Sequence, residues 1–378
     1  MTGPLSGVRI VELAGLGPAP FAGMMLADMG ADVIRVDRVT RHHEVAESTE
    51  LSEVIERGRR SIAVNLKDPR GVAIVLDLVA GADALMEGYR PGVAERLGVG
   101  PAPCLARNAR LVYGRMTGWG QDGPLAPTVG HDVNYIALTG VLDSIGPAGG
   151  GDPVLPLNLV GDFGGGGMLL AFGLVCGIVS ARTTGHGQVV DAAMVDGAAL
   201  LMAPYLARSE WGPRGTNMVD GGAHFYGVYA TADDRHVAVG ALEPQFYAVF
   251  LERLGLADAD LPAQMDQASW PAMRERVAAI FRGRTRDEWC AVFAGAETCF
   301  APVLGRDEAA SDPHLVARGT IVTRDGLVQP APAPRFDGTP ATLPPPRPRP
   351  GEQGNALLAE LGVPAAEVEA LRAAGVIG

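Results

Sequence analysis

The stretch VRIVELAGLGPAPFAGMMLADMGADVIRVD (residues 8–37) decides the fold class. Its apolar, β-branched ends at 8–13 and 31–37 predict two buried strands, and the pattern between them predicts a helix over 21–30 that ends at Gly30. The alternation continues with a predicted helix over 71–82 and predicted strands over 82–88 and 109–116. Strands that alternate with helices are typical of βαβ units. We therefore predict an α/β fold whose parallel sheet is covered by helices on both faces.

The pattern changes after about residue 186. Residues 186–208 predict a strand followed by a long helix, and 221–242 predict two strands joined by the turn ADDR. Helical patterns follow, which makes 221 to about 310 a candidate small α+β domain. The proline-rich residues 330–354 predict an extended surface connection that leads to a final helix. Upstream, the apolar spacing of 131–145 predicts a helix that begins at His131.

Composition limits the classes of function. The 378 residues carry a net charge of −12, which argues against a nucleic-acid-binding protein. The four cysteines have no CxxC pairing, so we predict no disulfides, no structural zinc and a reducing cytoplasm. The N-terminus lacks the regions of a signal peptide. The apolar run Met168–Ser180 has 13 residues, fewer than a membrane span needs, so we predict no membrane association.

Two glycine-rich motifs resemble nucleotide-binding loops, but neither motif has all the residues that such a loop requires. Gly15, Gly17 and Pro20 give G-x-G-x-x-P, in which proline replaces the third glycine, so a plain strand-to-helix turn is the preferred interpretation. GDFGGGG (161–167) lacks the lysine and hydroxyl of a phosphate-binding loop. It places Asp162 at the start of an apolar helix. From pattern alone, Asp162 is equally well a structural helix cap or an acid beside which the glycines admit another molecule.

Basic residues concentrate in the otherwise acidic chain. Arg57, Arg59, Arg60, Lys67 and Arg70 lie within 14 residues, and Arg35, Arg38, Arg90 and Arg96 follow neighbouring βα elements. We favour an anionic small ligand over a solvated surface with scattered ion pairs.

Two further residues are candidates for chemistry. His131 opens a helix and is a candidate general base, although a lone histidine is more often structural. Glu243 follows a strand and precedes Pro244, where an exposed loop acid is the simpler interpretation.

Taken together in order, the motifs resemble the family III CoA-transferase and racemase superfamily, and within it the α-methylacyl-CoA racemases. The resemblance covers essentially the whole chain. The motifs that carry it are GPLSGVRIVELAG (3–15), ADVIRVDR (31–38), GRRSIAVNLKDPRG (58–71), EGYRPGVAERLG (87–98), RMTGWGQDGP (115–124), GHDVNYIALTGVL (130–142), LNLVGDFGGGGM (157–168), GQVVDAAMVDG (187–197), VAVGALEPQF (237–246) and DPHLVARG (312–319).

The resemblance implies an interlocked homodimer of chains with a Rossmann-like large domain and a small α+β domain. On this sequence it places the Rossmann-like CoA-binding sheet in 1–185, a linker helix in 186–220 and the small domain in 221–325. Residues 326–378 form a proline-rich return and a C-terminal helix that complete the large domain.

The resemblance also implies the reaction, which is inversion of the α-carbon of 2-methylacyl-CoA thioesters. His131 and Asp162 would be the two bases on opposite faces of a planar enolate, and Glu243 would hydrogen-bond His131. No cofactor and no metal are required, since CoA is part of the substrate. The residues that would bind CoA are Arg38, Val64, Asn65, Leu66, Lys67, Gly88, Tyr89, Arg90, Arg96, Gly130, Asp132, Asn134 and Tyr135. Asn65 departs from the family pattern, which often has Asp there.

Two alternatives remain. In the CoA-transferases of the same superfamily the residue matching Asp162 is a nucleophile, but those enzymes typically lack the GHD-NY signature that this chain has at 130–135. A non-enzymatic acyl-CoA-binding protein is the alternative from another class.

Overall fold

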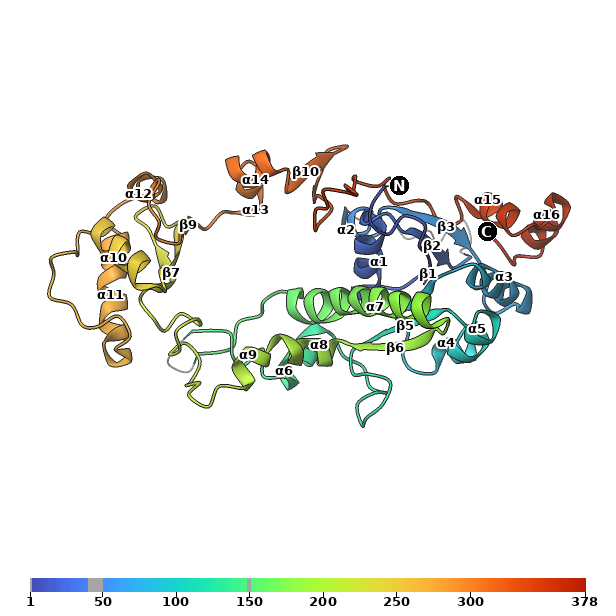
Figure 1. The fold of residues 1–378 in the computed structure, drawn as a ribbon, viewed down its shortest axis with the longest axis horizontal. Helices are drawn as coiled ribbons and strands as arrows, with labels where there is room; N and C mark the ends of the chain where they lie inside the picture. Colours follow the sequence, from blue (N-terminus) through green and yellow to red (C-terminus); the bar gives the residue numbers. More distant parts are fainter. Residues whose placement is uncertain (1, 40–49, 148–150) are drawn as a thin grey trace. The chain divides into compact units, whose positions relative to one another are not determined.

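The computed structural model of the chain describes residues 2–39, 50–147 and 151–378. The chain divides into two compact units (Figure 1). Unit 1 comprises residues 1–139, 157–203 and 319–378, and unit 2 comprises 140–156 and 204–318. The C-terminal segment thus belongs to the same unit as the N-terminal sheet.

Unit 1 is built on a six-stranded sheet in the order β3-β2-β1-β4-β5-β6, in which every pairing is parallel. The strands are β1 (Arg9–Leu13), β2 (Asp32–Asp37), β3 (Arg59–Ala63), β4 (Ala84–Glu87), β5 (Val112–Thr117) and β6 (Gln188–Ala193). The chain runs outward from β1 to β3 on one side and from β4 to β6 on the other, so the switch in strand order falls between β1 and β4. The predicted α/β class with a parallel sheet is confirmed.

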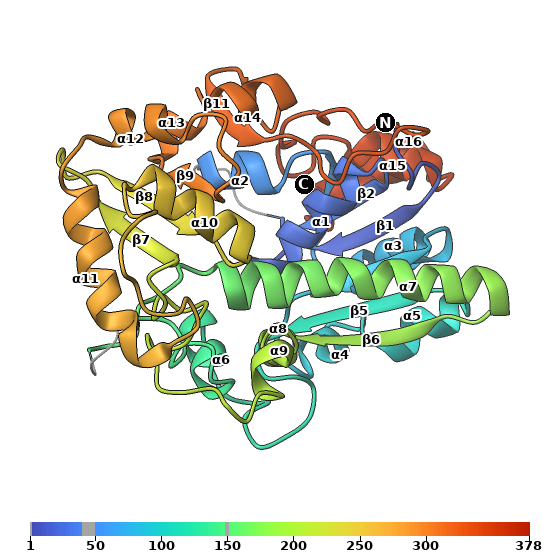
Figure 2. The same ribbon diagram turned by 60° about the vertical axis from the view of Figure 1, so that its left-hand side comes forward.

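Helices cover both faces of this sheet, as the sequence predicts. Alternate residues of β1 show the two sides: Ile10 packs into one apolar core and Val11 into the other. The Ile10 core includes α1 (Pro18–Asp28) and α7 (Leu169–Thr184), which lies along β5 and β6 (Figure 2). The Val11 core includes α3 (Pro69–Ala80), α5 (Pro101–Arg107), α15 (Gly354–Glu360) and α16 (Ala365–Ala373). Unit 1 also contains α2 (Glu50–Ile55), α4 (Val93–Arg96), α6 (Asp132–Leu138), α8 (Met194–Leu201) and the hairpin β10 (Ile321–Arg324) and β11 (Leu327–Pro330).

The turn after β1 is a plain strand-to-helix connection. Helix α1 begins at Pro18, three residues earlier than predicted, because a proline at the first helical position is already in helical conformation. Gly17 caps the helix with φ 70°, a backbone conformation that favours glycine. Pro18 and Pro20 carry no N–H, so the first turn of α1 offers fewer donors than a phosphate cradle needs.

The helix that contains Asp162 is longer than the sequence count suggests. The π-helical segment η1 (Leu159–Met168) continues directly into α7, giving 26 helical residues that suffice by length and composition to cross a membrane. The count of 13 apolar residues therefore underestimates this helix, and its length does not exclude a membrane span. Leu170 and Leu174 pack on the sheet as in a core helix, whereas Met168, Phe172 and Val179 on the other side are each more than half exposed in the single chain.

The arginines of the basic segment are engaged with carboxylates. Arg59 contacts Glu12 at 3.0 Å with both side chains fully buried, and Arg57 contacts Asp28 at 2.5 Å. The same holds for Arg35 with Glu12, Asp37 and Glu56, for Arg60 with Asp32 and Glu360, and for Arg70 with Asp68. The predicted use of Arg35, Arg57 and Arg59 for an anionic ligand is wrong, because all three are buried, whereas for the more exposed Arg60 and Arg70 it stays a prediction. All five arginines neutralise acids, several of them inside the sheet, where an unpaired charge would be costly.

Unit 2 contains an antiparallel sheet of β7 (Tyr226–Ala230), β8 (His236–Gly240) and β9 (Phe300–Pro302). The predicted two strands joined by ADDR are β7 and β8. Aromatic rings of Phe225, Phe250 and Phe281 form the centre of its core. The helices of this unit are α10 (Pro244–Arg253), η2 (Gln267–Ser269), α11 (Trp270–Phe281), α12 (Arg286–Phe293), α13 (Arg306–Ala309) and α14 (Pro313–Arg318), and α9 (Ala203–Leu206) leads into it.

Two predicted helices are shorter than expected. The helix expected over 131–145 is α6, and Gly140, with φ 79°, follows its end. The long helix expected after β6 is interrupted after Leu201 and resumes as the short α9. In both cases apolar spacing continues past the point where the backbone leaves the helix.

Helix α8 holds the Asp162 segment by close backbone contact. A Cβ at Gly197 of α8 would lie 1.8 Å from the carbonyl oxygen of Gly165 in η1. We expect Gly197→Ala to lower the free energy of unfolding by about 1–3 kcal/mol, measured by urea denaturation, because the two segments must separate. Gly81→Ala is the matched control, since a Cβ there meets no atom within 4 Å. Equal stability of the two variants would show that α8 and η1 are not so closely packed.

Candidate active site

A cavity of about 620 Å³ opens at the carboxyl ends of the central strands of unit 1. Its walls come from the loops after β1 and β4, the end of β5, the residue after β6, the loop before α6, and η1. The lining residues are Leu16, Gly17, Pro18, Gly88, Tyr89, Arg90, Pro91, Met116, Thr117, Gly118, Trp119, Ala126, Thr128, Val129, Gly130, His131, Tyr135, Asp162 and Met194. The cavity lies beside the switch between β1 and β4, where α/β sheets bind their ligands.

His131 reaches this cavity from the N-terminus of α6. It is the N-cap residue in extended conformation, and its backbone N–H donates to Asn134 Oδ1 at 3.0 Å. The Tyr135 hydroxyl donates to the carbonyl of Gly130, and the Tyr135 ring packs edge-on against Trp119 at 4.7 Å between centroids. The backbone at His131 is thus held on both sides, while the imidazole is left exposed to the cavity.

Asp162 reaches the same cavity from the first turn of η1. The helix begins three residues earlier, at Leu159, so Asp162 is not the N-cap residue that the pattern suggested. Its Oδ2 accepts a hydrogen bond from Asn158 Nδ2 at 3.0 Å. Burial raises the pKa of Asp162, and the charge of Asp132 raises it further, whereas the Asn158 hydrogen bond and the nearby His131 lower it. The net shift is upward, which favours a carboxyl that can both accept and return a proton.

The glycines around Asp162 serve helix packing rather than ligand access. A Cβ at Gly165 would lie 2.7 Å from the backbone nitrogen of Ala198, and one at Gly167 would lie 2.7 Å from the carbonyl of Pro18. Neither glycine lines the cavity. The idea that GGGG admits a substrate is therefore corrected: these glycines let α1 and α8 approach η1, and Gly17 is the glycine that faces Asp162, with a Cβ position 3.8 Å from Oδ2.

Several predicted CoA-binding residues lie at the same edge of the sheet. Gly88, Tyr89 and Arg90 line the cavity with Gly130 and Tyr135. Arg38 follows β2, and its charge acts on the Tyr89 hydroxyl, whose pKa burial raises and Arg38 lowers.

Residues 64–67 lie between β3 and α3. Val64 is buried and pairs with Ile377, and the Asn65 backbone N–H donates to the Val376 carbonyl. Asn65 Oδ1 accepts from the Lys67 backbone N–H at 3.1 Å, and Leu66 packs on the apolar core. The Lys67 side chain is exposed. This segment is fixed by the C-terminal residues, and its amide side chain shapes the turn.

Four basic residues differ from the buried arginines. Arg38, Lys67, Arg90 and Arg96 are exposed, and none has an ion pair with another described residue. All four follow the carboxyl ends of β2, β3 or β4. They are the cations predicted to bind CoA, and in the described part of the chain their charges are available to an anion.

These features together match a known family. The sequence profile of "CoA-transferase family III" matches residues 5–354. The chain belongs to CoA-transferase family III.

Two relatives and one solved structure show which proteins this chain is similar to. "Alpha-methylacyl-CoA racemase" of Mus musculus is 45% identical over 343 residues, covering 89% of this chain and 87% of the relative, and that of Homo sapiens is 44% identical with the same coverage. The crystal structure of a CAIB/BAIF family protein from Brucella suis has a TM-score of 0.82 at 23% identity, covering 96% of this chain and all of the other. The predicted resemblance to the racemases is confirmed, and the solved structure supports the fold.

Glu243 belongs to unit 2 of this family III chain. It is the N-cap residue of α10, in extended conformation before Pro244, and its side chain is exposed. Glu243 and His131 belong to different units, and the predicted hydrogen bond between them stays a prediction.

Part of the cavity wall is not predicted from the sequence. Trp119, Met116 and Met194 give it an apolar side, and the Trp119 indole N–H is buried without an acceptor among the described residues. The motif RMTGWGQDGP contains Met116 and Trp119, but a short motif does not tell which side chains turn toward a cavity. Among the described residues, no group of three His, Cys, Asp or Glu side chains could hold a metal ion.

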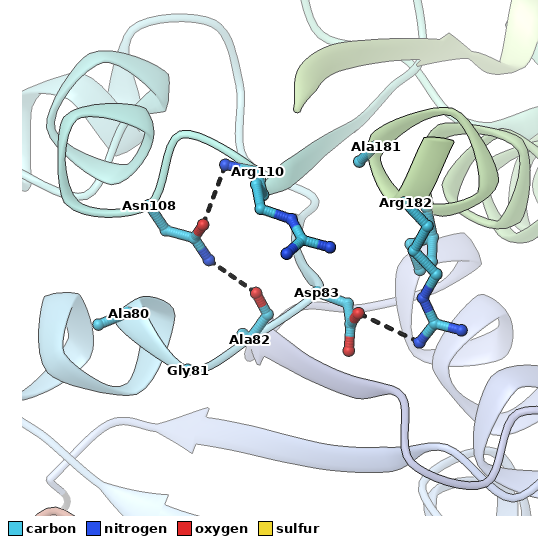
Figure 3. Close-up of a pocket in the computed structure, with 9 residues that line it drawn as sticks. Ala80, Gly81, Ala82, Asp83, Asn108, Arg110, Ala181 and Arg182 are labelled. Carbon is cyan, nitrogen blue, oxygen red and sulfur yellow. Dashed lines mark hydrogen bonds and ion pairs between the residues drawn. The ribbon is translucent and has the colours of Figure 1, made fainter. Parts of the chain in front are cut away.

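A second pocket, of about 290 Å³, lies at the opposite ends of the strands (Figure 3). Asn108 donates to the carbonyls of Val79 and Ala82, and Arg182 contacts Asp83 at 3.3 Å. Its side chains thus bond largely to the chain itself. It brings together no acid–base pair like that of His131 and Asp162.

Proposed function

We propose that this family III protein interconverts the two epimers of 2-methylacyl-CoA thioesters by moving a proton at the α-carbon. One observation carries the proposal: His131 and Asp162, 31 positions apart in the sequence, line one cavity. The 44–45% identity to the human and mouse racemases supports it.

The chemistry follows from two bases that face one carbon. One base removes the α-proton to leave a planar enolate of the thioester, and the other base returns a proton to the opposite face. The upward shift of the pKa of Asp162 suits this exchange, because a carboxyl near its usual pKa would return a proton poorly near neutral pH. In this proposal, backbone N–H groups at a helix N-terminus would stabilise the enolate oxygen. No cofactor is needed for these steps.

The remaining parts of the proposal concern binding and assembly. Glu243 would orient His131, and the nucleotide end of CoA would contact Arg38, Lys67, Arg90 and Arg96. The exposed apolar side of α7, with Met168, Phe172 and Val179, supports an interlocked homodimer in which a second copy covers it. We further propose the domain boundaries 1–185, 186–220, 221–325 and 326–378, and a cytoplasmic location without nucleic-acid or membrane partners.

The deciding experiment uses one epimer of a 2-methylacyl-CoA in heavy water with no acceptor acid. Loss of configuration with uptake of deuterium at the α-carbon supports racemisation. Absence of uptake, together with CoA transfer once a free carboxylic acid is added, would overturn the proposal in favour of a CoA-transferase. Absence of both activities would indicate an acyl-CoA-binding protein.

Arg90 provides a test of CoA binding. We expect Arg90→Ala to raise KM for the acyl-CoA by roughly 10- to 150-fold with little change in kcat, because one charge-assisted hydrogen bond is lost. With the same acyl group on pantetheine, which lacks the nucleotide phosphates, the variant and the parent should have equal KM. Arg70→Ala is the matched control, since Arg70 is paired with Asp68. An equal loss with both substrates would exclude a contact with the nucleotide.

Asn158 provides a test of the Asp162 carboxyl. The Asn158 hydrogen bond lowers the pKa of Asp162, so Asn158→Ala should raise that pKa further from the ordinary value of 3.8. Activity that needs the carboxylate is lost as the pH falls through this pKa. The acidic limb of the kcat/KM profile should therefore move to higher pH in the variant. A limb that stays in place would show that it does not report Asp162.

A further inference from the structure

Asp132 is buried, adjoins both bases and is not part of the cavity lining. It is the first residue of α6, directly after His131, and only 7% of its surface is exposed. Unlike His131 and Tyr135, it does not line the cavity. The family resemblance implies a CoA contact for Asp132, whereas its buried position suits a role inside the protein.

The Asp132 carboxylate is bonded to the backbone of the opposite base. Oδ2 accepts the backbone N–H of Asp162 at 2.7 Å. This N–H lies in the first turn of η1, where backbone donors have no partner within the helix. A charged acceptor on such a donor makes a strong hydrogen bond, and it joins the N-termini of α6 and η1.

Two further observations concern the Asp132 carboxylate: the space that a neighbouring glycine leaves for it, and its second oxygen. A Cβ at Gly161 would lie 2.5 Å from Asp132 Oδ2, so glycine is needed for the carboxylate to approach. The other oxygen, Oδ1, is buried and has no hydrogen-bond partner among the described residues. An orphaned carboxylate oxygen is costly, which indicates that the position serves something other than stability.

We propose that Asp132 is a positioning residue that fixes the separation of His131 and Asp162. This inference rests on the proposed racemase function. Asp132 is joined to His131 by a peptide bond and to the Asp162 backbone by a hydrogen bond, so a single residue connects the two bases. Proton transfer to opposite faces of one carbon requires this spacing to hold, since small displacements of catalytic groups sharply lower the rate.

The groups that shift the pKa of Asp162, besides its burial, are Asn158, Asp132 and His131. His131, Asp132 and Tyr135 approach it from α6, and Asn158 approaches from its own segment. The neighbouring α1 and α8 present Pro18, Gly197 and Ala198 to η1, none of which carries a charge. Removing the Asp132 charge therefore removes the acidic neighbour of Asp162.

The test compares Asp132→Ala, Asp132→Asn and Gly161→Ala in the full-length protein, with Asp258→Asn as an exposed-acid control. We expect Asp132→Ala to lower kcat on the order of 100-fold, with KM for 2-methylacyl-CoA nearly unchanged. Asp132→Asn keeps an oxygen acceptor, so it should lose less activity but shift the acidic limb of kcat/KM to lower pH. Asp258→Asn should leave both unchanged.

Gly161→Ala keeps the proposal testable if Asp132→Ala does not fold. In the parent it should lower kcat with KM nearly unchanged, and this result needs no Asp132→Ala protein. Where Asp132→Ala folds, Gly161→Ala should have a smaller effect in that background, because the added methyl group and the carboxylate compete for one space. If the effects of Gly161→Ala and Asp132→Ala on kcat are strictly additive, the positioning role is overturned. A rise in KM with unchanged kcat in Asp132→Ala would also overturn it, in favour of a CoA contact.

Amide hydrogen exchange separates this inference from the proposed function. The peptide 157–168, followed by mass spectrometry, should exchange faster in Asp132→Ala than in the parent and in Asp258→Asn. If the parent has no racemase activity but shows this difference, the proposed function fails and the contact stands. If exchange is equal in all three, the contact itself is absent.

Discussion

Asp162→Asn is expected to lower the rate of epimer interconversion by roughly 100- to 10,000-fold, the usual contribution of a general acid or base. The substitution keeps the size of the side chain but removes the group that accepts and returns the proton. His131→Ala should have a comparable effect, because inversion needs both bases. The measurement is the loss of optical configuration of one 2-methylacyl-CoA epimer over time.

Deuterium exchange adds a sharper result for the same two variants. With one base removed, the other can still exchange the α-proton of the epimer that faces it, without inverting the carbon. Each variant should therefore retain exchange with one epimer, and the two variants should retain it with opposite epimers. Asp258→Asn is the charge control, since Asp258 is exposed and lies in unit 2. Full racemisation by either variant would contradict the assignment of two bases.

Glu12→Ala is expected to produce the largest loss of stability. Glu12 is fully buried at the end of β1, and its oxygens contact Arg59 Nε at 3.0 Å and Arg35 Nη1 at 3.3 Å. Burial lowers the pKa of Arg59, and the charge of Glu12 counteracts that effect. Without Glu12 a buried guanidinium loses its main counter-charge. We expect a loss of about 3–5 kcal/mol in the free energy of unfolding, measured by urea denaturation.

Asp77→Ala is the matched control for this prediction. Asp77 contacts Arg107 at 2.7 Å, a distance similar to that in the buried pair, but both side chains are about half exposed. Exposed pairs contribute about 0–1 kcal/mol because water solvates each partner alone. If Glu12→Ala lowers the free energy of unfolding no more than Asp77→Ala does, the buried ion pairs of Glu12 do not stabilise the protein as inferred.

The arginines show where sequence pattern stops being informative. Arg59 and Arg90 are the same residue type, and the sequence pattern groups both with the basic residues expected to bind an anionic ligand. Arg59 is buried against Glu12, 47 positions away in the sequence, whereas Arg90 lines the cavity. Counting basic residues finds a cluster but cannot find the distant carboxylates that neutralise most of it.

The Asp162 segment shows the same limit. The apolar pattern predicts its helix and the motif predicts its importance. The glycines have a packing role that depends on α1 and α8, which come from residues well before and after them in the sequence. The interpretation of Asp132 also changes, because only the folded chain reveals that its carboxylate accepts a hydrogen bond from the backbone of Asp162.

The sequence by itself determined the alternation of strands and helices, the parallel sheet with two covered faces, and the family. These follow from local periodicity and ordered motifs, which need no knowledge of distant contacts. Only the tertiary structure decided which charges are neutralised, which glycines serve packing, and that His131 and Asp162 share one cavity. Those properties depend on residues brought together across the sheet, and burial and charge pairing exist only once the chain has folded.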